Sequence, residues 1–173
     1  KVTYASVGSN HCQWRVAKQH VGKGTDDWGV FIGRQLARLA KETKAKNIRF
    51  IEPAEWDESL ALDVFDDRYH ILGIVHGHQV NRPDNMSTWW RGQAFGSQPV
   101  AAATTLCHGH FHHLRVQELG MTDDGRSRFI VGAPTMDNGS NWFRNMTGEQ
   151  ATPGLATFIL EKHEPFQGTV HKL

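Results

Sequence analysis

Two apolar segments of this chain each end directly in a group of histidines. The run Tyr69–Val75 leads into His76-Gly77-His78, and the run Val100–Leu106 leads into residues 107–113. Apolar runs of this length, bounded by turn residues, are typical of buried strands. Six of the eleven histidines lie between His76 and His113, and imidazole is the commonest metal ligand in proteins. We therefore expect a sheet whose buried strands carry a metal site at one edge.

Elsewhere in the chain, the first half alternates between predicted helices and strands, and the second half is rich in predicted strands. A helix is predicted from Asp27 to Lys46, because apolar residues recur there at helical spacing after the N-terminal signals Thr25 and Asp26. A second helix is predicted at 85–95. Strands are predicted at 2–7, 47–51, 60–65, 69–75, 100–106, 114–119, 128–131 and 155–161. These elements predict an α/β fold, a layered sheet flanked by helices.

Length and composition indicate one soluble domain, residues 1–173, with residues 163–173 expected to fray. The 19 basic and 18 acidic residues leave a net charge of +1, so no overall basic field indicates a partner. No apolar stretch approaches the roughly 18 residues of a membrane helix, and residues 1–30 lack the pattern of a signal peptide. Cys12 and Cys107 are too few for a disulfide scaffold and fit a reducing, cytoplasmic compartment.

Three polar groups each follow a predicted strand. They are Asn10-His11, His76-Gly77-His78 and His110-Phe111-His112. In an extended segment alternate side chains share a face, so His110 and His112 are expected to reach the same small volume. Gly77 and Gly109 would let the backbone turn closely around bound ions. We expect the three strand ends to converge.

These motifs resemble a known family. Gly8-Ser9-Asn10-His11-Cys12 resembles the Gly-Asn-His-Asp motif of calcineurin-like metallophosphoesterases. Val75-His76-Gly77-His78 resembles the family's strand-plus-histidine motif, and Gly109-His110-Phe111-His112 is similar to its Gly-His-x-His motif. The three occur in the family's order, in a match that covers about residues 2–161. The segment 140–154, with Gly139-Ser140-Asn141-Trp142 at its start, looks like the sheet-closing tail of phage-encoded members related to DNA repair exonucleases.

The resemblance implies a metallophosphoesterase-type sheet sandwich and a hydrolase with two divalent metal ions, Mn²⁺ being the best suited and Fe, Zn or Ni admissible. Asn10, His76 and His110 would ligate one ion. His112 would complete the site of the other ion, and His11 would protonate the leaving oxygen. Four further residues would support the metal ligands or face the substrate: Cys12, His78, His108 and His113. For the three histidines an ordinary structural role is equally open.

The chain departs from the family in two ways. Cys12 replaces an aspartate that normally orients the preceding histidine. The Asp-x-His and Gly-Asp-x-x-Asp motifs, which supply most of the negative charge, do not occur. We expect this chain to be the C-terminal part of the fold, with a missing N-terminal segment or a second chain supplying those motifs. The competing hypothesis is that Asp84 or Asp137 takes the bridging role, while Asp26 and Asp27 are weaker candidates.

The sequence therefore predicts a metal-dependent phosphoester hydrolase, most simply a phosphodiesterase or nuclease acting on DNA or nucleotides. This chain alone would lack part of the active site and is expected to be inactive. A phage-encoded protein of this kind would act in the cytoplasm of its host. The alternative is a non-catalytic binding or scaffold module in a nucleic-acid complex. A third hypothesis is a small structural zinc protein that uses Cys12, Cys107 and histidines as ligands. Aromatic residues stand beside arginines as on single-stranded nucleic-acid surfaces in Trp14-Arg15, Trp89-Trp90-Arg91 and Trp142-Phe143-Arg144, but packing against the sheet is the favoured interpretation.

Overall fold

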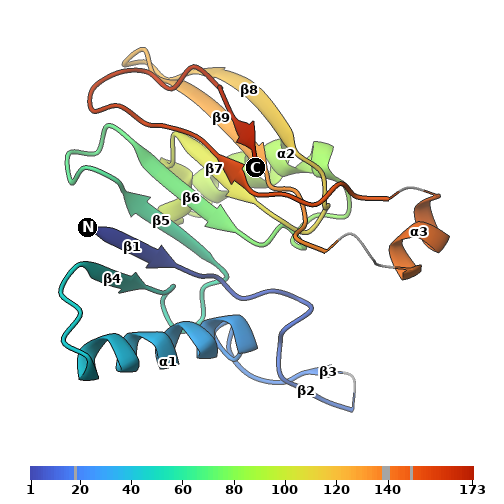
Figure 1. Ribbon diagram of the computed structural model, residues 1–173. Coiled ribbons are helices and arrows are strands. Elements are labelled where there is room, and N and C mark those ends of the chain that lie inside the picture. The colour runs from blue at the N-terminus through green and yellow to red at the C-terminus, as the bar shows by residue number, and fades with distance from the viewer. Residues whose placement is uncertain (18, 138–140, 149) are drawn as a thin grey trace.

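The centre of the molecule is a five-stranded mixed sheet (Figure 1). The computed structural model describes residues 1–17, 19–137, 141–148 and 150–173. Across the sheet the strands run in the order β5 (Ser59–Asp63), β6 (Ile71–Val75), β7 (Thr105–His108), β9 (Ser127–Gly132) and β8 (Arg115–Met121). The three inner strands are parallel and the two outer strands are antiparallel to their neighbours. The expected α/β class is confirmed.

One face of this sheet is covered by helix α2 (Met86–Phe95), which is flanked by the 3₁₀ turns η1 (Pro83–Asn85) and η2 (Pro99–Ala102). Leu106 and Ile130 are register partners on neighbouring strands, and both side chains enter the core beneath this helix. Trp90 is 2% exposed and donates its indole N–H to the carbonyl of Val100 at 2.9 Å. For this tryptophan the packing interpretation is confirmed.

The other face of the sheet is covered by the C-terminal segment (Figure 1). Strand residues Phe129 and Val131 alternate with the residues that face α2, and the ring of Phe166 packs on Phe129 with centroids 5.0 Å apart. Strand β10 (Ala156–Thr157) pairs with β11 (His171–Lys172). The segment 163–173, for which fraying was expected, contains β11 and the buried side chain of Phe166.

A smaller unit lies beside the main sheet. Strand β1 (Val2–Ala5) pairs in parallel with β4 (Ile48–Ile51), and helix α1 (Trp28–Glu42) connects them and packs on the pair (Figure 1). Before α1 the chain forms the short hairpin β2 (Arg15–Val16) and β3 (Gln19–His20). This unit carries the Asn10-His11 motif, directly after β1.

Three predicted elements differ most in extent. The expected strand 100–106 begins only at Thr105, because Pro99 starts a 3₁₀ turn with its fixed φ. Helix α1 ends at Glu42, and Lys44 adopts a left-handed φ of 57° that stops the helix. The strand expected at 155–161 shrinks to the two residues of β10.

The segment 140–154, expected to close the sheet, contains a helix, α3 (Asn141–Thr147). Gly139 and Ser140, with which that segment begins, lie outside the described residues. None of the helices in the described ranges is long and apolar enough to cross a membrane.

Candidate functional site

The structure brings three of the predicted site residues together from three separate loops. His11 follows β1, His76 follows β6, and His110 follows β7. The ring centroids of His76 and His110 are 5.0 Å apart, and the ring of His11 lies 5.9 Å from His76 and 5.8 Å from His110. We call these three residues with His78 the histidine cluster, since the ring of His78 lies 5.3 Å from that of His76.

The loop that carries Asn10 and His11 is fixed by one buried carboxylate. Asp27 caps helix α1 through Oδ1, which accepts the N–H groups of Gly29 and Val30 at 2.7 and 3.2 Å. Its Oδ2 accepts the backbone N–H of Ser9 at 3.0 Å. The sequence indicated Asp27 as a helix start but gave no sign of this second contact.

Close backbone approaches hold the other two loops against each other. The N–H of Gly109 donates to the carbonyl of His76 at 2.9 Å. Gly77 has a φ of +112°, and a Cβ there would lie 3.1 Å from the Gly109 carbonyl oxygen, so glycine is required at this position.

The segment after β7 is not extended. His110 and His112 have φ values of 70° and 62°, in the left-handed region that costs most residues about 1–2 kcal/mol each. The expectation that they share one face of an extended segment is therefore wrong, because each reverses the backbone. Strained residues of this kind cluster at functional sites.

Burial and the charges of neighbouring histidines favour the neutral form of two members of the cluster, His76 and His110. Burial lowers the pKa of His76 to about 4, helped by the charges of His110, His78 and His11. The pKa of His110 and that of His112 are also lowered, in each case first by burial and then by the charge of His11. Neutral imidazoles keep the lone pairs that metal binding requires.

Two atoms that could ligate a metal ion, Oδ1 of Asn10 and Nδ1 of His110, are buried without a hydrogen-bond partner. Buried polar atoms are normally paired, so both atoms are suited to hold a ligand. Among the described residues, however, no three His, Cys, Asp or Glu side chains are arranged to hold a metal ion. The residues thus fit part of a site for one divalent ion. They do not fit two ions, which require carboxylates to offset their repulsion.

Sequence reasoning missed one residue of the site. Glu58, just before β5, accepts from Nε2 of His78 at 3.3 Å and from the amide of Gln79 at 3.0 Å. The hydrogen bond from His78 lowers the pKa of Glu58. The predicted strand pair could have indicated this residue, because pairing of Ser59 with Val75 places Glu58 opposite His76.

The remaining predicted residues lie around the cluster. His108 is buried in β7 with Nδ1 2.9 Å from the Gly109 oxygen, and burial lowers its pKa. His113 is exposed, as is the free thiol of Cys12. Burial raises the pKa of Cys107 to about 12, which disfavours the thiolate that zinc binds.

The two candidate bridging aspartates are placed differently. The carboxylate of Asp84 is paired with Arg115 at 2.5 Å. The charge of Asp137 acts to raise the pKa of His112, but burial has the larger and opposite effect, so this pKa is lowered overall.

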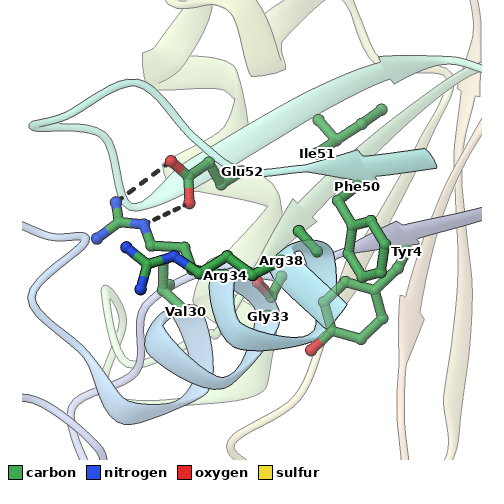
Figure 2. Close-up of a pocket in the computed structure, with 10 residues that line it drawn as sticks. Tyr4, Val30, Gly33, Arg34, Arg38, Phe50, Ile51 and Glu52 are labelled. Carbon is green, nitrogen blue, oxygen red and sulfur yellow. Dashed lines mark hydrogen bonds and ion pairs between the residues drawn. The ribbon is translucent and has the colours of Figure 1, made fainter. Parts of the chain in front are cut away.

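A groove of about 430 Å³ lies elsewhere, between α1 and the β1–β4 pair (Figure 2). Tyr4, Gly33 and Phe50 line it, and Arg34 forms a two-point ion pair with Glu52 at its edge. None of the histidines lines this groove, so it is not the site of the cluster.

No protein-family model and no curated protein sequence matches the chain. Solved structures that resemble it include wild-type Vps29 complexed with Zn²⁺ from Entamoeba histolytica, at 15% identity and a TM-score of 0.43, over 99% of this chain and 95% of that one. A single mutant of the same Vps29 gives 15% identity and a TM-score of 0.42, over 70% of this chain and 61% of that one. A predicted phosphoesterase from Streptococcus pneumoniae gives 12% identity and a TM-score of 0.37, over 74% and 71%. What this chain does is therefore inferred from its own side chains.

Proposed function

We propose that this chain forms the histidine-rich part of a metal-dependent phosphoester hydrolase, a phosphodiesterase or nuclease acting on DNA or nucleotides. One observation supports the proposal most. Three imidazoles from separate loops lie within 6 Å of one another, and Oδ1 of Asn10 and Nδ1 of His110 are buried without a hydrogen-bond partner. A bound divalent ion supplies charge neutralisation and an activated water for attack on phosphorus.

In this proposal the residues of the chain have distinct roles. Asn10, His76 and His110 bind the ion, and His112 lies at its margin. His11 is exposed at the edge of the cluster and donates a proton to the leaving oxygen. The carboxylates that a second ion requires come from a further segment or a second chain.

A second function has its own support. The absence of a three-donor group among the described residues favours a non-catalytic scaffold or binding module. Such a module would keep the fold and the histidine cluster but would not catalyse hydrolysis.

Calorimetric titration with Mn²⁺, together with hydrolysis of a bis-aryl phosphate diester, separates these functions. We expect the chain alone to bind at most one ion weakly and to hydrolyse the ester negligibly. Adding the segment or chain that bears the missing carboxylates should produce Mn²⁺-dependent hydrolysis. Failure of metal binding in both preparations would favour the scaffold. Two tightly bound ions with ordinary turnover in the chain alone would show that an aspartate such as Asp137 bridges them.

A further inference from the structure

Three aromatic side chains lie exposed in mutual contact next to the His11 loop. Trp14, Trp28 and Phe31 are 45%, 55% and 37% exposed. Their ring centroids are 5.8 Å apart for the two tryptophans, and Phe31 lies 5.7 Å from Trp28 and 6.5 Å from Trp14. We call this trio the aromatic patch. Large aromatic rings usually bury 150–250 Å² each, so a solvent-exposed group of three indicates a binding surface.

The aromatic patch and the histidine cluster are joined through the backbone. The N–H of Trp28 donates to the carbonyl of Cys12 at 2.9 Å, and the N–H of Trp14 donates to the carbonyl of Asp26 at 3.1 Å. Because Cys12 directly follows His11, the patch is held at a fixed position beside the proposed site. A ligand on the rings would extend towards His11.

Positive charge is concentrated on the same part of the chain. Residues 10–46 hold eight Lys and Arg against three Asp and Glu, although the whole chain has 19 against 18. The guanidinium of Arg15 donates to the carbonyl of Asn10. Arg38 lies two helical turns beyond Phe31, and Figure 2 shows Arg34 and Arg38 extending towards the same end of the groove. An anionic ligand is therefore favoured over a neutral one.

We propose that the aromatic patch binds single-stranded nucleic acid, with bases stacked on Trp14 and Trp28 and phosphates near Arg15 and Arg38. Every base has a π-face, so exposed rings beside cationic side chains suit such a strand. The direction of the strand towards His11 rests on the proposed function, whereas the binding itself does not. The aliphatic residues Ile32, Leu36 and Leu39 continue the exposed face of α1 and would serve a protein partner instead.

Fluorescence anisotropy with a labelled oligothymidine, measured in EDTA, tests the binding without metal or turnover. Trp14→Ala and Trp28→Ala should each weaken binding by at least about fivefold, the lower end of the loss expected for one stacked base. Phe95→Ala is the matched control, because Phe95 is 97% exposed on α2 and lies outside the patch. Arg38→Ala should reduce the slope of log affinity against log salt by about 0.7.

Circular dichroism checks that each variant is folded, and Trp14→Phe, which keeps a ring, should restore most of the affinity. The proposal is overturned if the chain does not bind the oligonucleotide, or if Trp14→Ala and Phe95→Ala have the same effect. It is also overturned if the chain shows no oligonucleotide affinity but forms a dimer, and the substitution Leu36→Ser dissociates that dimer. Binding in EDTA, with no hydrolysis after both metal and the segment or chain that bears the missing carboxylates are added, would retain this proposal and reject the hydrolase.

Discussion

The imidazoles of His76 and His78 meet through their Nδ1 atoms, 3.2 Å apart, at the end of strand β6. Glu58 accepts a hydrogen bond from Nε2 of His78, so Nδ1 of a neutral His78 has no proton and acts as an acceptor. His76 must then donate its Nδ1–H to that atom. The remaining nitrogen of His76, Nε2, is left with a free lone pair, which is the form that binds a metal.

Replacing Glu58 should disturb this tautomer. In Glu58→Gln the side chain can donate as well as accept, so His78 loses the charge that fixes its proton on Nε2. We expect Mn²⁺ affinity to fall by about tenfold, the lower end for groups that orient a ligand. Calorimetry measures the affinity, and ¹⁵N spectra of the imidazoles report the tautomer of His76. Glu55→Gln removes an exposed carboxylate nearby and serves as the control. An unchanged tautomer in Glu58→Gln would contradict the assignment.

The sequence predicted helices α1 and α2 and the longer strands because each depends on local patterns. The apolar run before His76 indicated β6, and Asp27 indicated the start of α1. The left-handed backbone at His110 and His112 could not be predicted, because it depends on close packing of the loops after β6 and β7. Burial of Phe166 likewise depends on a long-range contact, with Phe129.

For the candidate site, the sequence identified the histidines but not the groups that support them. Glu58 could have been found by extending the predicted hairpin register past Val75 to the residue opposite His76. The contact between Asp27 and Ser9 had no such signal, because it joins residues that no regular pairing relates.

Acid should destabilise the fold through His76. Its pKa is about 4 in the folded chain and about 6.5 when unfolded, so the unfolded state binds more protons between these values. The free energy of unfolding should therefore decrease as the pH falls from about 6.5 to 4 and change little from this group above 6.5. Urea unfolding at several pH values measures it. His76→Gln should flatten the dependence, and the exposed His171→Gln should leave it unchanged. Equal slopes in wild type and His76→Gln would refute the prediction.

Asp27 should contribute more than an ordinary helix cap. Loss of the cap costs about 1 kcal/mol, and loss of the bond from Ser9 adds about 1 kcal/mol more. Asp27→Ala should therefore lower the free energy of unfolding by about 2 kcal/mol. Asp27→Asn keeps an oxygen for the cap and should be milder. Urea denaturation of both variants tests this. An equal loss of unfolding free energy in both would mean that an oxygen at the cap position does not account for the stabilisation.

The core beneath α2 should be sensitive to truncation. Leu106 is fully buried between β6, β9 and the helix, so Leu106→Ala leaves a cavity and should cost about 2–5 kcal/mol. Phe95→Ala, at an exposed position of α2, should change stability by less than about 0.5 kcal/mol. Thermal and urea unfolding compare the two variants. A loss of unfolding free energy below about 1 kcal/mol for Leu106→Ala would mean that the surrounding core relaxes to fill the cavity.

The last prediction separates the roles of His11 and His110. Nδ1 of His110 is buried and unpaired, so His110→Ala should abolish the weak Mn²⁺ binding of the chain. His11 is exposed at the edge of the cluster, so His11→Ala should leave metal binding nearly unchanged. Where hydrolysis is restored by the missing carboxylates, His11→Ala should lower turnover by about 10²-fold or more, as expected for a lost proton donor. His113→Ala, at an exposed histidine nearby, is the control. Equal loss of metal in the His11 and His110 variants would show that both bind the ion and that the proton donor lies elsewhere.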